Sequence, residues 1–358
     1  MAAEQTQKAG VFARAAASLA AEPGTGMRAL PRAAELVRPV APGLADIMAS
    51  SAVRSYADAY PRYSEEAARQ QSLLMREATL ANLCLLGAGV LSGLVLVGPN
   101  ATALLGDVLT RRVTLILGVA TLALGALAAI FSYRARESDR LRRWYTTRSQ
   151  AELARLATFR ALVASSAAAG ADTAAAALAL VWRHLFEDQR QWMVSRAARH
   201  RLSSERTNLW GGIASALAFV GGSGAVIASF EPGQSWITVA GVIGAAIAAY
   251  ALGREGLRRD RANADRYEKS AVALDQLAGR LDEVVANTEA GRTDAMRAFV
   301  DEITAQLETE HKQWLDGATQ AEAALARLDA RLQALREPPP KGAPTLVVAQ
   351  PEREPQRP

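Results

Sequence analysis

Three histidines, His184, His200 and His311, are the residues of this 358-residue chain best suited to acid–base or metal chemistry. None of them has the spacing of a metal-ligand motif. The segment "ETEH", Glu308 to His311, could form a carboxylate–imidazole pair, although polar residues on an exposed helix face are far more common. The segment "GGSGAV", residues 221–226, loosely resembles a glycine-rich phosphate loop but lies inside an apolar run. We therefore predict no catalytic residue, no metal site, no cofactor and no enzymatic activity.

Small residues inside the apolar runs are the second group that could carry function. The segments "GVLSG" and "GGSG" would allow helices to approach closely. They have two interpretations, which are helix packing within a hairpin and the lining of a lumen in an oligomer. The predicted spans contain no charged residue or histidine, which argues against a transporter or pump. The residues concerned are Gly89, Ser92, Gly93, Ser215, Gly221, Ser223 and Gly224.

Four stretches without a charged residue must position these side chains: 78–106, 113–133, 207–230 and 232–253. A helix needs roughly 20 apolar residues to cross the hydrocarbon core of a membrane. We therefore predict spans at 80–97, 113–131, 209–230 and 236–252. The expected fold is an all-α membrane protein with two transmembrane hairpins and long cytoplasmic amphipathic or coiled-coil-like helices. The alternative is a buried helical hairpin within a large soluble protein.

Arginines beside these runs predict the orientation of the chain. They follow the second and fourth spans and precede the third, and positive residues near span ends stay in the cytoplasm. Both termini and the middle segment are therefore expected in the cytoplasm, with two short loops outside the cytoplasmic (inner) membrane. Arg111 and Arg112 in the first outer loop run against this rule. The net charge of +5 is better explained by lipid headgroups than by nucleic acid. A single cysteine, Cys84, rules out a disulfide framework.

The order of segments indicates an internal duplication of helix, hairpin and helix. An apolar stripe with helical spacing, Leu274–Val284 and Phe299–Trp314, lies in the second half. The expected segments are a mobile Ala/Pro-rich arm (1–56), a first two-span module (57–165), an Ala-rich linker (166–182), a second two-span module (183–318), a helix end (319–336) and a disordered Pro-rich tail (337–358).

Several short motifs resemble a known family. "FVDEITAQLETEHKQWL" at residues 299–315 resembles the closing helix of the second module of tandem SLATT proteins, the SMODS- and SLOG-associating two-transmembrane effectors. "EDQRQW" and "ADRYEKSAVALDQL" are similar to other helices of that module, and "RWYTTRSQAELARL" is similar to the companion module. The matching positions are Trp144, Tyr145, Glu152, Asp188, Arg190, Trp192, Tyr267, Phe299, Asp301, Glu310, His311 and Trp314.

The resemblance implies a pore-forming or membrane-depolarising effector of a bacterial conflict system, such as abortive infection of phage-infected cells. It also implies a homo-oligomer in the lipid bilayer and a nucleotide-signal system, whose sensor would be a separate protein or the arm at residues 1–56. A non-conducting membrane anchor is the competing hypothesis, in which the stripe Leu274–Val284 and Phe299–Trp314 would dock partner proteins.

Overall fold

The computed structural model describes residues 10–22, 24, 26–95, 106–137, 139–228 and 235–336, without the side chains of 136–137, 222–228, 235–236, 318–325 and 327–336. Most of the first outer loop, most of the "EPGQS" turn and the Pro-rich tail lie outside these residues. The chain divides into two compact units. Unit 1 comprises Met1–Ala78, Arg134–Thr207 and Glu255–Ala324, and unit 2 comprises Thr79–Tyr133, Asn208–Arg254 and Leu325–Pro358.

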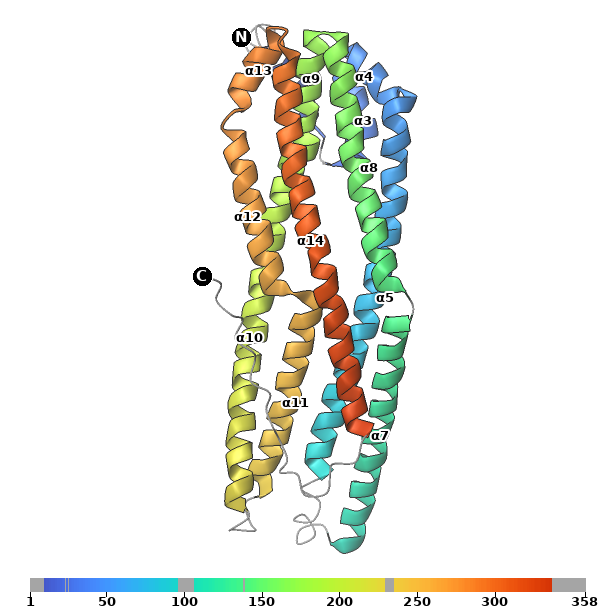
Figure 1. The fold of residues 1–358 in the computed structure, drawn as a ribbon, viewed down its shortest axis with the longest axis vertical. Helices are drawn as coiled ribbons and strands as arrows, with labels where there is room; N and C mark the ends of the chain where they lie inside the picture. Colours follow the sequence, from blue (N-terminus) through green and yellow to red (C-terminus); the bar gives the residue numbers. More distant parts are fainter. Residues whose placement is uncertain are drawn as a thin grey trace. The chain divides into compact units, whose positions relative to one another are not determined.

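The described residues form helices and turns, with no strand among them, so the predicted all-α fold is confirmed (Figure 1). The elements are α2 (Val11–Ala20), η1 (Met27–Ala29), α3 (Leu30–Val37), α4 (Pro42–Ala49), α5 (Ser51–Val95), α7 (Asp107–Glu137), α8 (Arg140–Ala169), α9 (Ala171–Val181), the π-helical η2 (Trp182–Glu187), α10 (Asp188–Ala228), α11 (Ser235–Arg258), α12 (Asp260–Ala278), α13 (Leu281–Glu289) and α14 (Thr293–Arg336).

Among the described residues, three stretches of helix are long and apolar enough to cross a membrane. They are Ser51–Val95, the stretch that begins at Asp107 and the stretch that begins at Ile237. They contain the predicted spans 113–131 and most of 80–97 and 236–252. The predicted span 209–230 is not among the three stretches. It falls on α10, and it runs beyond the residues whose side chains are described.

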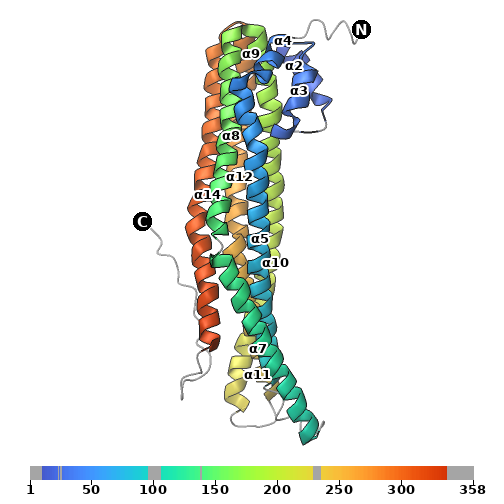
Figure 2. The ribbon, with the colours of Figure 1, turned by 90° about the vertical axis from the view of Figure 1, so that its right-hand side faces the viewer.

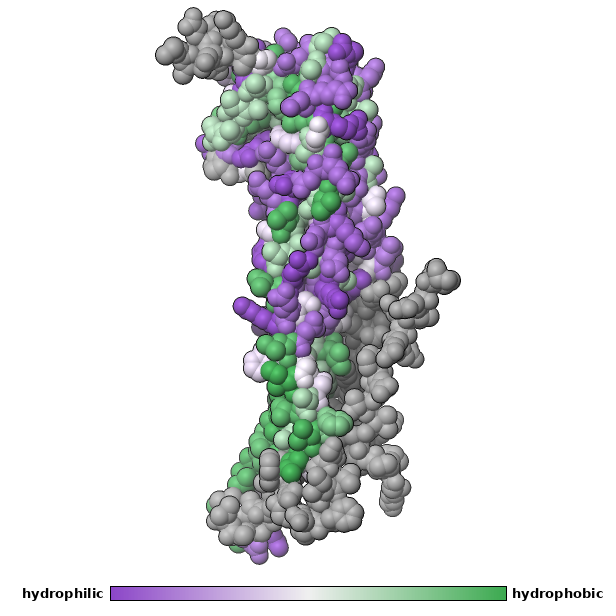
Figure 3. Space-filling model, turned by 90° about the vertical axis from the view of Figure 1, so that its left-hand side faces the viewer, coloured by the Kyte–Doolittle hydropathy of each residue, from purple (hydrophilic) through white to green (hydrophobic). Residues whose placement is uncertain are grey.

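Unit 2 exposes apolar side chains along its helices. In an apolar segment of 18 residues within the stretch that begins at Asp107, only 6% of the residues are buried. Leu115, Ile116 and Leu122 of this helix are 68%, 66% and 76% exposed, and Phe219 of α10 is 77% exposed. Hydrophobic side chains accordingly dominate the described surface of unit 2 in Figure 3, whereas hydrophilic ones dominate that of unit 1. Because large exposed apolar patches are rare in soluble proteins, this surface suggests association with a membrane.

The core of unit 1 is built around α9, which lies in the segment expected to be a linker. Every residue from Ala174 to Val181 is buried, because alanine side chains let α2, α4, α8 and α13 approach the helix from several sides. A helix that is apolar all round is stable only when it is buried in this way. Asp172, the residue that argued against a fifth span, is exposed in the first turn. There its carboxylate interacts favourably with the helix N-terminus.

The N-terminal region, which we expected to be a mobile or loosely packed arm, contains four packed helical elements. Its short helices α2, α3 and α4 bury one apolar face each, including Leu19, Val37 and Leu44. Both α2 and α4 contact α9 (Figure 2). The Ala/Pro-rich composition therefore reflects short amphipathic helices that begin at prolines, rather than an unstructured segment.

The stripe on the C-terminal helices is also part of this core. Leu274 of α12, Val284 of α13 and Phe299, Ile303 and Leu307 of α14 are all less than 5% exposed. They belong to one hydrophobic cluster with the α9 residues. The expectation that this stripe is a docking face for partners is therefore wrong, because its apolar residues already pack against their own unit.

Both halves of the chain share one backbone feature. Asp139, between α7 and α8, has a φ of 52°, and Arg259, between α11 and α12, has a φ of 51°. The left-handed region is uncommon for residues other than glycine. Each break follows the helix that contains the second predicted span of its hairpin.

Candidate functional site

An aromatic cluster joins α8 to α14 in unit 1. The ring centroid of Trp314 lies 5.5 Å from that of Trp144 and 4.5 Å from that of Tyr145. The His311 ring stacks on Trp314 at 5.6 Å. These four residues come from two motifs that lie about 170 positions apart in the sequence, and they form one contact surface. Aromatic pairs of this kind contribute stability beyond the area that they bury.

A buried carboxylate lies on the same face of α8, about two turns after the aromatic pair. Glu152 is paired with Arg148 and with Arg155, each at 2.5 Å, and the side chains of Glu152 and Arg155 are 7% and 8% exposed. Burial acts to raise the pKa of Glu152, but the charges of Arg155 and Arg148 outweigh it and lower the pKa. Glu152 is therefore ionised at neutral pH and balances two cations inside the unit.

A second ion pair connects α12 to α14. Arg266 donates to Glu310 at 3.0 Å, and both side chains are largely buried. The guanidinium of Arg266 also lies 4.8 Å from the ring centroid of Tyr267, which is close enough for a cation–π interaction. Burial raises the pKa of Glu310 despite the charge of Arg266, and burial likewise raises the pKa of Tyr267. The two glutamates of the site thus have pKa values shifted in opposite directions.

His311 lies between these groups, and it does not form the pair with Glu308 that "ETEH" suggested. Its Nε2 is 3.1 Å from the hydroxyl of Ser149, whereas Glu308 accepts from Arg160 at 2.6 Å. Burial lowers the pKa of His311 below that of a free histidine. The imidazole is therefore neutral at physiological pH and acts as a hydrogen-bonding and stacking group.

Of the remaining motif positions, one extends this site and the others lie elsewhere in unit 1. Trp192 meets Tyr267 edge-to-face at 5.0 Å and so extends the site onto α10. Arg190 pairs with Asp275 at the surface. Asp188 accepts from Gln189 at 3.0 Å, Phe299 is a core residue, and Asp301 is exposed. The structure therefore brings together Trp144, Tyr145, Glu152, Trp192, Tyr267, Glu310, His311 and Trp314.

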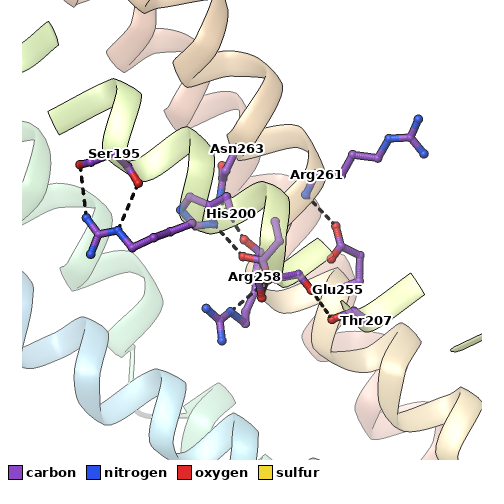
Figure 4. A network of polar contacts seen from close by, with 10 residues as sticks. Ser195, His200, Thr207, Glu255, Arg258, Arg261 and Asn263 are labelled. Carbon is purple, nitrogen blue, oxygen red and sulfur yellow. Dashed lines mark hydrogen bonds and ion pairs between the residues drawn. The ribbon is translucent and has the colours of Figure 1, made fainter. Parts of the chain in front are cut away.

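Sequence reasoning missed a polar junction where α11 gives way to α12 (Figure 4). Asp260, which is fully buried, lies 2.7 Å from Nδ1 of His200 and accepts from the hydroxyl of Ser203 at 2.5 Å. Arg258 is 3.4 Å away. Burial acts to raise the pKa of Asp260, but the hydrogen bonds from His200 and Ser203 and the charge of Arg258 lower it. The only available signal was an aspartate directly after an arginine pair at the end of an apolar run.

The small residues of unit 2 lie mostly at helix contacts. A Cβ on Gly89 would be 2.6 Å from Cβ of Ala246, so this glycine packs α5 against α11. Gly93 approaches Val242 and Ile243 of the same helix. Gly221 meets the backbone of Gly241 in the second hairpin. Ser92 and Ser215 are exposed, and Ser223 and Gly224 belong to the part of α10 whose side chains are not described.

We expect Gly221→Ala to destabilise unit 2, because the added Cβ would lie 2.0 Å from the Cα of Gly241. The two helices would have to separate, and overpacking of this kind costs about 1–3 kcal/mol. Gly212→Ala, on the same helix but with nothing within 4 Å of its Cβ, is the control. Thermal unfolding in mild detergent measures both, and equal midpoints would contradict the close packing of α10 on α11.

The described residues hold no group of three or more His, Cys, Asp or Glu that could bind a metal ion. The Arg266–Glu310 pair joins α12 to α14, and the aromatic cluster with the His311–Ser149 contact joins α8 to α14. No family model, curated protein or solved structure matches this chain. The SLATT resemblance therefore stays a prediction from the motif residues.

Proposed function

We propose that this chain is an integral membrane effector of the SLATT type that depolarises the cell when it oligomerises. The observation that carries the proposal is the exposure of apolar side chains along helices of membrane-spanning length in unit 2. In water such a surface would drive aggregation, whereas in a bilayer it faces lipid. The proposed location is the cytoplasmic membrane with four spans and both termini in the cytoplasm.

Unit 1 supports a role in regulation. Trp192 joins the aromatic and charged site to α10, and α10, like α5, runs without a break from unit 1 into unit 2. A partner that changes the packing of α8, α12 and α14 would therefore act on helices of the proposed pore. The resemblance supplies the proposed setting, which is a bacterial defence system with a separate sensor protein and a homo-oligomeric effector.

The proposal predicts that induction of the protein, together with its trigger, collapses the membrane potential. Leu122→Lys should abolish this effect, because a lysine at the centre of a span costs about 3 kcal/mol for insertion. Leu153→Lys, which alters a leucine of unit 1 that is 61% exposed, should retain the effect. A potential-sensitive dye in living cells provides the measurement. Normal polarisation under every trigger, or full depolarisation by Leu122→Lys, would contradict the proposal.

A further inference from the structure

A groove of about 850 Å³ runs along α5 and α7 in unit 2. Its walls are almost entirely apolar and include Val95, Gly118, Val119 and Leu122. None of the residues that line it belongs to the aromatic and charged site of unit 1. The groove is open along its length, so a molecule could enter it sideways from the surrounding medium.

Thr110, Arg111 and Thr114 line the groove near the start of α7. Of the other polar residues that line it, Ser92 lies on α5, and Thr121 already donates to the carbonyl of Leu117. Thr110 is 6% exposed, and its hydroxyl oxygen is buried without a hydrogen-bond partner. Arg111 follows directly, is exposed, and forms no ion pair with any residue in the described ranges. A buried polar group without a partner is unusual in native proteins. A hydroxyl and a guanidinium side by side are suited to hold an anionic oxygen, since charge-assisted hydrogen bonds are the strong ones.

The length of the groove matches one leaflet of a bilayer. From Thr110 to Leu122 the helix rises about 18 Å, at about 1.5 Å per residue. The hydrocarbon core of a bilayer is about 30 Å thick, so one leaflet contributes about 15 Å. A single acyl chain lying along α7 would therefore follow the apolar wall while its headgroup reached the polar end.

We propose that this groove binds one anionic phospholipid, with its phosphate at Thr110 and Arg111 and an acyl chain along Gly118 and Leu122. The inference rests on the proposed function only in so far as α5 and α7 lie in a bilayer. A second copy of the chain fits less well, because a two-fold contact through the groove would bring Arg111 of each copy together. An anionic headgroup instead neutralises this charge and gives the Thr110 hydroxyl an acceptor.

Native mass spectrometry of the full chain in mild detergent tests the proposal, with added phosphatidylglycerol or phosphatidylethanolamine. We expect one phosphatidylglycerol to be retained in preference to phosphatidylethanolamine. Arg111→Gln and Thr110→Val should each lower this retention about tenfold, since loss of one charge-assisted hydrogen bond has that order of effect. Arg112→Gln is the matched control, because Arg112 is exposed and does not line the groove. Equal retention by wild type, Arg111→Gln and Arg112→Gln would overturn the proposal.

Filling the groove with a larger side chain provides an independent test of the proposal. A Cβ on Gly118 meets nothing within 4 Å, so Gly118→Leu places its side chain in the groove without a clash, and retention should fall. Gly125→Leu, which has equal space but does not line the groove, should leave retention unchanged. If Gly118→Leu lowers the oligomer mass and leaves lipid retention intact, a second copy occupies the groove and the proposal fails.

Carbonate extraction of the same membranes separates this proposal from the proposed function. Protein that stays in the membrane without selective lipid retention contradicts only the lipid site. Protein that is washed out contradicts both. If the protein retains the lipid but never depolarises cells, the lipid site is supported and the proposed conducting function is contradicted.

Discussion

Replacing Glu152 by alanine should lower the free energy of unfolding of unit 1 by about 3–5 kcal/mol. The substitution removes the carboxylate that lies 2.5 Å from both Arg148 and Arg155. Arg155 would then be a buried cation without a counter-charge, and its Nε already lacks a partner. A guanidinium titration in mild detergent, followed by helical circular dichroism, measures the loss.

Two further variants show whether the loss comes from the unpaired cation. Glu152→Leu combined with Arg155→Leu should recover most of the stability, because replacing both members of a buried pair by apolar residues is often neutral. Glu308→Ala is the matched control in the same interface of α8 with α14. Its partner Arg160 is 43% exposed, so the expected loss is only about 0–1 kcal/mol. Similar losses for Glu152→Ala and Glu308→Ala would contradict the buried-charge account.

Unit 1 should lose about 3 kcal/mol of stability between pH 6.5 and pH 4 through His184 alone. This residue lies in the π-helical turn η2, is 1% exposed, and has no hydrogen-bond partner at either ring nitrogen. Burial lowers its pKa from 6.5 to about 4, and Arg183 adds to this effect against Asp188, Glu22 and Glu187. The unfolded chain therefore binds a proton first as the pH falls, and stability present above pH 6.5 is lost.

His184→Leu isolates this contribution. The leucine is apolar and close in size, and no hydrogen bond is lost because the ring forms none, so stability at pH 7.5 should be equal or higher. The carboxylate of Glu152 titrates in both proteins, and it acts mainly at lower pH because its pKa is depressed. The difference between the two unfolding curves from pH 7.5 to pH 4.5 therefore reports His184. Parallel curves would show that His184 does not titrate in this range.

The sequence predicted the helical class and the positions of the apolar helices well, because long uncharged runs have few stable structures besides a helix. Run 113–131 and most of runs 80–97 and 236–252 fall on helices long and apolar enough to span a membrane. The run 209–230 falls on α10 and continues past residue 221, beyond the described side chains, and α10 is not among these three. The membrane insertion and topology stay predictions.

Composition misrepresented the alanine-rich regions. Alanine is neutral in hydropathy and in insertion, so residues 166–182 read as a linker, whereas small side chains are what allow α9 to be packed on all sides. The N-terminal helices were hidden for a related reason. Helices of eight to ten residues give a weak periodic signal and are stable only through their contacts with the rest of the unit.

The candidate site separates what the sequence predicts from what only the tertiary structure shows. The sequence by itself determined which residue types could serve, since the resemblance to the SLATT family singled out the motif positions Glu152, His311 and Trp314. Only the tertiary structure decided that they meet, that Glu308 pairs with Arg160, and that Asp260 accepts from Ser203 and pairs with His200. The physical reason is that burial and charge pairing depend on distances between helices that are far apart in the chain, and local periodicity carries no information about those distances.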